Sequence, residues 1–317
     1  MSRPHEGKEF TLSLNLSYYC NLRCNFCYLT PEQLGDRQKA PLEAIAARLD
    51  EVLAEGYHVT HIDLYGGEIG LLPKSYVDAV KDLLHSRGID DIVLITNLTA
   101  VNDIILDEDY ELSVSYDFSA REKHELVFDN ILTLPRWFNM LTLASRELLD
   151  NVSVDEMVAT YNLMVNAKSV EIKPYSENQS NQQRVTFAEY EELVWALINH
   201  PERNFHIENQ QHLIKAVDGY GHSYSDDHLY ITPEGTFAVL EFDLNDREFF
   251  LPIKDMADYH RWCEVEKARV AKNAFCGQCE YKGRCLSEHL RTVTSLEHSC
   301  NGFYNLLKRW EEHEGTA

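Results

Sequence analysis

Apolar runs of strand length alternate with helical patterns along the first two thirds of the chain. The predicted strands are Leu12–Leu16, His61–Tyr65, Ile92–Thr96, Leu112–Tyr116, Met140–Leu143 and Ser169–Lys173. The predicted helices are Leu42–Glu55, Ser75–Ser86, Arg121–Leu132, Val154–Asn166 and Phe187–Asn199. Only the connection Leu98–Asp109 lacks a clear helical pattern. Such alternation is typical of βαβ units and predicts an α/β fold with a parallel sheet.

The pattern changes after His200. A hairpin is predicted over His228–Phe242, turning at Pro233-Glu234-Gly235, and helices are predicted over Met256–Val270 and Phe303–Glu312. A cysteine-rich segment separates the two helices. We therefore expect two domains, residues 1–204 and residues 205–317.

Charge limits the partners of this chain. Its 317 residues include 52 acidic and 29 basic side chains, for a net charge of −23. Such a surface repels phosphate backbones, which argues against nucleic acid. Solubility or a salt-adapted host is the favoured explanation of the charge, and attraction of a cationic substrate is the alternative. The first residues have no apolar core of an export signal, and no run is long enough to span a bilayer. The prediction is a cytoplasmic protein without a membrane partner.

Eight cysteines in a chain without an export signal favour metal ligation over disulfides. Cys20, Cys24 and Cys27 form CxxxCxxC directly after the first predicted strand. Three thiolates on one tight loop, with no fourth nearby, suit a four-iron cluster whose last iron is open. The alternative is three buried cysteines acting as small hydrophobic residues. Gly66-Gly67-Glu68 ends the second predicted strand.

Together, these two motifs resemble the signature of the radical SAM superfamily. The resemblance implies a partial (βα)6 TIM-type barrel in which the open iron chelates S-adenosylmethionine (SAM). It also implies that Gly66, Gly67 and Glu68 hold the methionine end of SAM and that Phe26 lines the adenine. Motifs at strand ends are expected at the carboxyl rim of the barrel, where barrel chemistry gathers.

One further strand end matches a feature of the SPASM-type barrels in this superfamily, and a second strand end is similar to it. Ser115 and Asp117 form a Ser-x-Asp motif, which implies a serine at the SAM ribose and an acid near the substrate, with a catalytic role for Asp117. Asn97, after Thr96, ends the third strand in a similar way and is a candidate cofactor contact. Capping of the following segment is the alternative role for both motifs.

A second cysteine group, Cys276, Cys279, Cys285 and Cys300, forms CxxCx5C with a distal fourth cysteine. By ligand type alone, this group suits a tetrathiolate zinc site or an iron–sulfur cluster. The segment resembles the second half of a SPASM extension, which implies an auxiliary four-iron cluster. His289 and Leu240 stand where that family places further cysteines. We therefore expect a SPASM-like domain reduced to one auxiliary cluster, which gives two 4Fe–4S clusters per chain. The auxiliary cluster would either pass electrons or stabilise the small domain.

The resemblance implies an enzyme that takes an electron from flavodoxin or ferredoxin, cleaves SAM reductively to a 5′-deoxyadenosyl radical and abstracts a substrate hydrogen atom. Maturation of a ribosomally synthesised peptide is the favoured outcome. The first alternative is an epimerase or dehydrogenase of an amino sugar or other small metabolite, in which Cys263 would donate a hydrogen atom. Helical spacing makes Cys263 a core residue in the competing interpretation. The second alternative is a catalytically silent iron–sulfur or zinc protein on the same scaffold.

Overall fold

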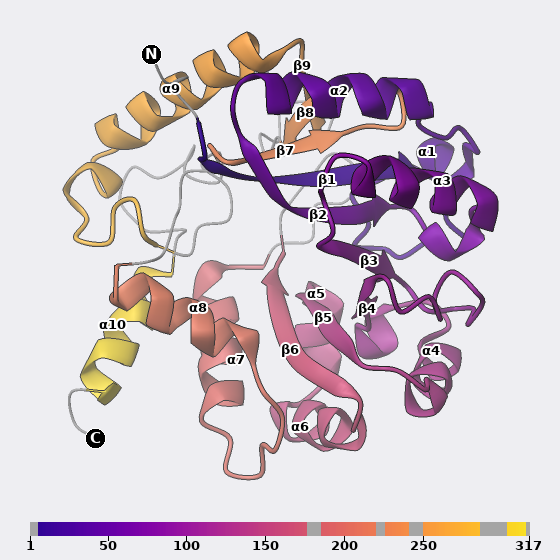
Figure 1. Cartoon of the computed structure of the whole chain (residues 1–317). Coiled ribbons are helices and arrows are strands. Elements are labelled where there is room, and N and C mark those ends of the chain that lie inside the picture. Colours follow the sequence, from indigo (N-terminus) through magenta and orange to yellow (C-terminus); the bar gives the residue numbers. More distant parts are fainter. Residues whose placement is uncertain (1–5, 176–184, 220–225, 241–249, 286–302, 315–317) are drawn as a thin grey trace.

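A computed structural model describes residues 6–175, 185–219, 226–240, 250–285 and 303–314 (Figure 1). Within these residues, nine strands form one sheet in the order β6-β5-β4-β3-β2-β1-β7-β8-β9. The first six are parallel: β1 (Glu9–Ser17), β2 (His58–Gly66), β3 (Ile92–Thr96), β4 (Glu111–Ser115), β5 (Phe138–Ala144) and β6 (Ala167–Pro174). The predicted α/β partial barrel is confirmed.

The second part of the chain extends this sheet. β7 (His228–Ile231) pairs in parallel with β1, and β8 (Phe237–Leu240) and β9 (Phe250–Ile253) follow as antiparallel strands. β7 and β8 are the predicted hairpin, whereas β9 was not predicted. Figure 1 shows β7 to β9 at the end of the sheet away from β6. The sheet therefore continues past the predicted domain boundary at residue 205, which stays a prediction.

Helices connect and cover the strands. The predicted ones are α2 (Leu42–Ala54), α3 (Lys74–His85), α4 (His124–Thr133), α6 (Val154–Leu163), α7 (Phe187–Ile198), α9 (Met256–Lys272) and α10 (Tyr304–Glu314). Three helices were not predicted: α1 (Pro31–Gly35), α5 (Arg146–Asn151) and α8 (Glu208–Val217). α1 and α5 are too short to show a helical period, and side-chain caps from Thr30 and Ser145 begin them.

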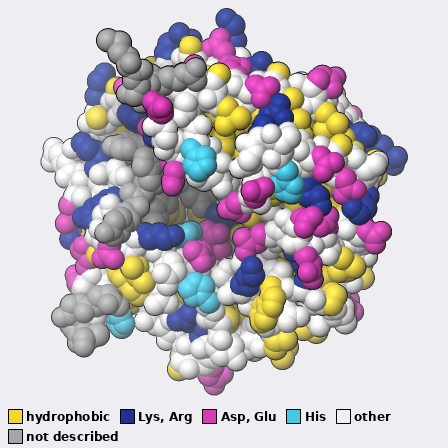
Figure 2. Space-filling view, in the orientation of Figure 1, with side chains coloured by type: hydrophobic (Ala, Val, Ile, Leu, Met, Phe, Trp, Pro, Cys, Tyr) yellow, Lys and Arg dark blue, Asp and Glu magenta, His cyan; other side chains and the backbone are white. Residues whose placement is uncertain are grey.

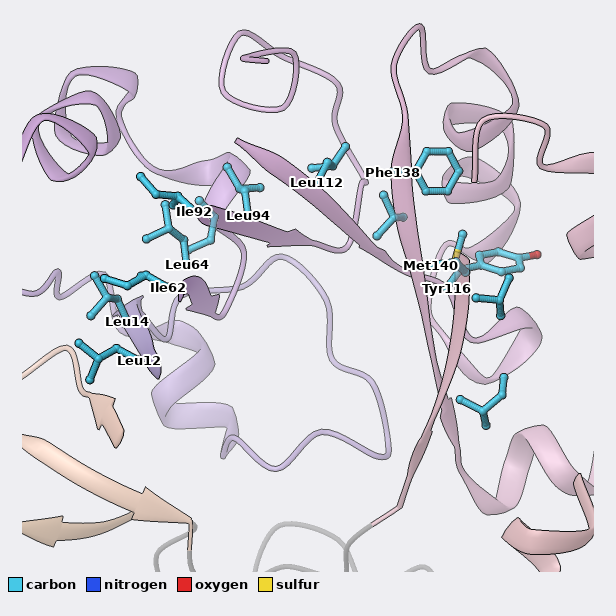
Figure 3. Packing of buried hydrophobic residues seen from close by; sticks show 14 of the residues in the cluster. Leu12, Leu14, Ile62, Leu64, Ile92, Leu94, Leu112, Tyr116, Phe138 and Met140 are labelled. Atoms are coloured by element: carbon cyan, nitrogen blue, oxygen red, sulfur yellow. The ribbon is translucent and has the colours of Figure 1, made fainter. Parts of the chain in front are cut away.

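Alternation along the strands divides their side chains between two environments. Leu12 and Leu14 on β1, with Ile62 and Leu64 on β2, are fully buried in the main core, which Figure 3 shows at close range. The residues between them, such as Ser13 and Asp63, line the interior of the barrel instead. Each parallel strand thus packs one apolar face outward and presents another, often polar, to the barrel interior.

The register of β1 and β2 brings the two sequence motifs together. Ser17 is paired with Gly66, so the chain enters the cysteine loop beside the point where Gly66-Gly67-Glu68 begins. Both segments follow the carboxyl ends of parallel strands.

In the described part of the chain, no helix combines the length and apolar character that a bilayer crossing requires.

An ion-pair network lies near the amino-terminal part of β2. The two ring nitrogens of His61 are each 3.1 Å from a carboxylate oxygen, one of Asp63 and one of Asp91. The hydrogen bond with Asp63 is the largest influence and, with the nearby carboxylates, raises the pKa of His61 to about 9, against the opposing effect of burial. The imidazolium is therefore present in the folded protein at neutral pH.

We expect this network to stabilise the fold in a pH-dependent way. Because the folded-state pKa of His61 lies above its unfolded value of about 6.5, its stabilisation is complete below that unfolded value and is lost as pH rises through about 9. Urea denaturation should show His61→Gln less stable than wild type at about pH 6, with the gap closing by about pH 10. His58→Gln, an exposed change on the same strand, is the control. A gap that does not vary with pH would contradict the assignment.

Candidate active site

One cavity of about 580 Å³ occupies the barrel interior and brings most of the predicted site residues together. Figure 2 shows a hollowed region on one face, bordered by acidic, basic and histidine side chains. Predicted site residues among its lining are Cys20, Cys24, Phe26, Cys27, Gly66, Gly67, Asn97, Ser115 and Asp117. Glu68 and Cys263 are not among the lining residues.

The cysteine loop is held by its own backbone and by one arginine. The amide of Cys20 donates to the carbonyl of Leu34 on α1 at 3.1 Å, and the amide of Cys27 donates to the carbonyl of Cys24 at 3.1 Å. The Arg23 guanidinium donates to the carbonyls of Cys20 and Leu22 at 2.8 and 2.7 Å. These bonds fix the loop so that its three sulfurs border the same cavity.

Burial raises the pKa of all three thiols in this loop, that of Cys27 to about 12. The thiolate is the form that ligates metal. Binding of iron at this loop must therefore displace protons, and the free energy of ligation offsets that cost.

Gly66 and Gly67 allow a close approach between two backbone segments. The amide of Gly67 donates to the carbonyl of Ser17 at 2.8 Å, and the amide of Glu68 donates to that of Tyr19 at 2.9 Å. A Cβ on Gly67 would lie 2.2 Å from the Tyr19 carbonyl oxygen. The glycines are thus required because residues 66–67 pack closely against the start of the cysteine loop. This requirement is independent of any need for space around a ligand.

Glu68 is buried and makes its hydrogen bonds within the protein. Its Oε1 accepts from the amide of Gly70 at 2.8 Å and from the Thr96 hydroxyl at 2.7 Å, and its Oε2 accepts from the amide of Asn97 at 2.7 Å. Burial raises the pKa of Glu68, and these bonds oppose the rise. The carboxylate therefore ties the end of β2 to the end of β3. Its predicted contact with SAM stays a prediction.

Asn97 lies next to the cysteine loop. Its Nδ2 donates to Cys20 Sγ at 3.6 Å and to Asn21 Oδ1 at 3.1 Å, while its Oδ1 accepts from the amide of Thr99 at 2.9 Å. Ser115, at the end of β4, lines the same cavity as Asn97 and Asp117. Both residues are placed where a molecule in the cavity would meet them.

Asp117 forms a buried ion pair with Arg121, which none of the sequence motifs includes. Asp117 Oδ2 accepts from Arg121 Nε at 2.7 Å and lies 2.5 Å from Arg121 Nη2. Asp117 Oδ1 accepts from the amide of Leu143 at 2.6 Å. Acid and arginine four residues apart can form an ion pair on an α-helix, so this spacing was the signal in the sequence that could have indicated the pair. The segment between the two residues is instead a 3-10 turn (Phe118–Ala120).

The second cysteine group is described in part. Cys276, in a 3-10 turn (Cys276–Gln278) after α9, Cys279 and Cys285 are half-buried, whereas Cys300 and His289 lie outside the described residues. Burial, followed by the nearby thiols Cys285 and Cys279, raises the pKa of Cys276. Three of the four predicted ligands are therefore neighbours in space.

Cys263 lies away from the cavity. It is 4% exposed on α9 and belongs to the hydrophobic core. Burial raises the pKa of Cys263 to about 12. Its surroundings are those of a packed core thiol, and its predicted role as a hydrogen donor stays a prediction.

The arrangement of the first three cysteines fits an iron–sulfur cluster. Among the residues that the structure describes, no three His, Cys, Asp or Glu side chains converge closely enough to hold a single metal ion. A four-iron cluster instead binds each thiolate through a different iron, so its ligands surround a volume. Cys20, Cys24 and Cys27 border a shared cavity that also has room for a second molecule.

Family comparison agrees with this site. Residues 14–119 match the model of the radical SAM superfamily. This stretch contains the cysteine loop, Gly66-Gly67-Glu68 and the Ser115–Asp117 strand end. The match identifies residues 14–119 as a radical SAM domain, and the cofactors of that superfamily are a 4Fe–4S cluster and SAM.

Solved structures show the same fold over nearly the whole chain. The protein is similar to anSMEcpe with bound AdoMet and Cp18Cys peptide, with a TM-score of 0.67 and 14% identity over 97% of both chains. It is also similar to Streptococcus suis SuiB bound to precursor peptide SuiA, with a TM-score of 0.62 and 15% identity over 87% of this chain and 71% of SuiB. The likeness to anSMEcpe extends into the carboxyl-terminal part of the chain, where the SPASM-like extension stays a prediction.

Proposed function

We propose that this radical SAM enzyme abstracts a hydrogen atom from a peptide substrate, as a step in maturing a ribosomally synthesised peptide. The observation that carries the proposal is the cavity that joins the three-cysteine loop to the polar interior of the barrel. A substrate in this interior would lie next to the place where SAM is cleaved.

Different residues of the chain would bind the cluster and the parts of SAM. Bound at Cys20, Cys24 and Cys27, the cluster would supply the electron that cleaves SAM, with flavodoxin or ferredoxin as the proposed donor. Gly66 and Gly67 would offer backbone groups to the methionine end, and Phe26, Asn97 and Ser115 would contact the rest of SAM. The barrel positions the reacting groups and excludes water.

Two of the structures with this fold support a peptide as the substrate. The anSMEcpe structure contains a bound peptide, and SuiB is bound to its precursor peptide. The cavity interior presents Asp63, Glu111 and Glu171, together with Lys173. Polar groups of both signs suit a substrate with hydrogen-bonding groups, such as a peptide segment.

The test is an anaerobic reaction of the reconstituted protein with dithionite, SAM and a short peptide encoded beside it. We expect release of 5′-deoxyadenosine and a mass change in the peptide, located by tandem mass spectrometry. A loaded protein that cleaves SAM but leaves every candidate peptide unchanged, while altering an amino sugar, would replace the peptide proposal with the epimerase or dehydrogenase. That alternative gains no support from Cys263, which packs in the core.

The second cysteine group is proposed to hold one auxiliary 4Fe–4S cluster. Wild-type protein should then contain about eight irons after reconstitution, and Cys279→Ala should contain about four. Iron analysis with metal-specific mass spectrometry makes this measurement. About four irons with bound zinc in the wild type would show that the second centre is a zinc site.

A further inference from the structure

A buried positive charge lies at the edge of the cysteine loop. Arg121 has only 12% of its side chain exposed, and its partner Asp117 has 1%. The guanidinium carbon of Arg121 lies 5.4 Å from the centre of the Phe26 ring, and Phe26 stands between Cys24 and Cys27 in the loop. The ion pair and all three cysteines line the same cavity.

The fold places this cation beside the loop that carries all three predicted ligands. Arg121 follows β4 in the sequence, yet its guanidinium packs over the Phe26 ring within the loop. A cluster bound at Cys20, Cys24 and Cys27 would therefore share its cavity with a fixed, buried positive charge.

We propose that Arg121, held in place by Asp117, is a positioning residue that sets the reduction potential of the cluster bound at Cys20, Cys24 and Cys27. The inference rests on the cluster of the proposed function. Reduction adds one negative charge to the cluster, and a fixed cation nearby stabilises the reduced form more than the oxidised form. Net charge, hydrogen bonds to sulfur and solvent exposure are the levers that tune such centres.

Asp117 gives the cation its place and limits its effect. With Oδ2 on Arg121 and Oδ1 on the amide of Leu143, the carboxylate ties the guanidinium to the end of β5. An unpaired guanidinium in this environment would be costly to bury. The carboxylate also offsets part of the positive charge, so the two residues are expected to move the potential in opposite directions.

Hydrogen bonds to Cys20 sulfur form a second, independent contribution. The amide of Leu22 and the side-chain amide of Asn97 donate to Cys20 Sγ at 3.5 and 3.6 Å. These donors remain in place when Arg121 is replaced, because neither contacts the ion pair. A change in potential on replacing Arg121 would therefore report its charge.

The experiment is an anaerobic redox titration followed by electron paramagnetic resonance. The signal of the open cluster is identified as the one that changes when SAM is added, and the other cluster serves as an internal reference. Arg121→Gln should lower the potential of the SAM-sensitive cluster so that reduction is about tenfold less favourable, about 59 mV for a one-electron couple. Arg121→Lys, which keeps the charge, should shift it less, and Asp117→Asn should raise it.

The outcomes separate this inference from the proposed function. A SAM-sensitive cluster with the same potential in wild type and Arg121→Gln would overturn the inference and leave the function standing. Absence of any SAM-sensitive signal in the loaded wild type would overturn the function itself. If Arg121→Gln fails to load iron, Asp117→Asn decides: a higher potential supports the inference, and an unchanged or lower one rejects it.

Discussion

Replacing Cys24 by Ala is expected to abolish the release of 5′-deoxyadenosine from SAM under dithionite. Cys24 is one of three thiols that border the cavity from a single loop. With two thiolates left, the site cannot hold a four-iron cluster with only one open iron. Liquid chromatography of the anaerobic reaction measures the product, and iron analysis of the variant should show the loss of one cluster.

Cys263→Ala is the matched control, since it removes another buried cysteine from a place outside the cavity lining. We expect it to keep SAM cleavage and iron content, and to lose about 1–2 kcal/mol of stability as a small core truncation. Full SAM cleavage by Cys24→Ala would remove the cysteine loop from the mechanism. If Cys263→Ala cleaves SAM but no longer converts substrate, Cys263 would instead be assigned the role of a hydrogen donor.

Gly67→Ala is expected to be among the most damaging single changes to the fold. Its Cβ would lie 2.2 Å from the carbonyl oxygen of Tyr19 and 2.5 Å from that of Tyr18, and both are backbone atoms with little freedom to move. Relief of the clash must break the hydrogen bonds that join Gly67 to Ser17 and Glu68 to Tyr19. We expect a loss of about 4 kcal/mol or more, measured by urea denaturation, together with loss of SAM binding by calorimetry.

Gly35→Ala, at the end of α1, provides the comparison, because a Cβ there meets nothing within 4 Å. This variant should retain wild-type stability and SAM binding. A Gly67→Ala protein as stable as Gly35→Ala would mean that residues 17–19 and 66–68 can separate without cost. The glycines would then be required by the ligand alone.

Much of the fold follows from local pattern. β3 has the predicted bounds, and the other five predicted strands of the barrel are present with ends one to three residues away at most. The helices α1, α5 and α8 and the strand β9 were missed. The apolar residues of α1 and α5 are too few to show a period, and β9 is defined by its pairing with β8. Pairing between distant segments leaves little trace in either segment alone.

Some residues of the candidate site could likewise be predicted from local sequence patterns, and others could not. CxxxCxxC and Gly-Gly-Glu could be read from the chain because their spacing is local, and the order of strands places both at one edge of a parallel sheet. Arg121 was missed, since an arginine becomes informative only when its partner and its burial are known. The contact of Glu68 with SAM stays a prediction, and the described hydrogen bonds of its carboxylate join the ends of β2 and β3.

By itself, the sequence determined the candidate metal ligands and the fold class of this protein. It contains three thiolates on one loop, a second cysteine group and a repeating βα pattern. Only the tertiary structure decided which polar groups lie beside that loop. The pairing of Ser17 with Gly66 packs the two motifs together, and the turn after β4 buries Arg121 against Asp117. The spacing of the ligands is set by covalent neighbours. The charge around them depends on segments about a hundred residues away in the sequence, which meet only when the sheet assembles.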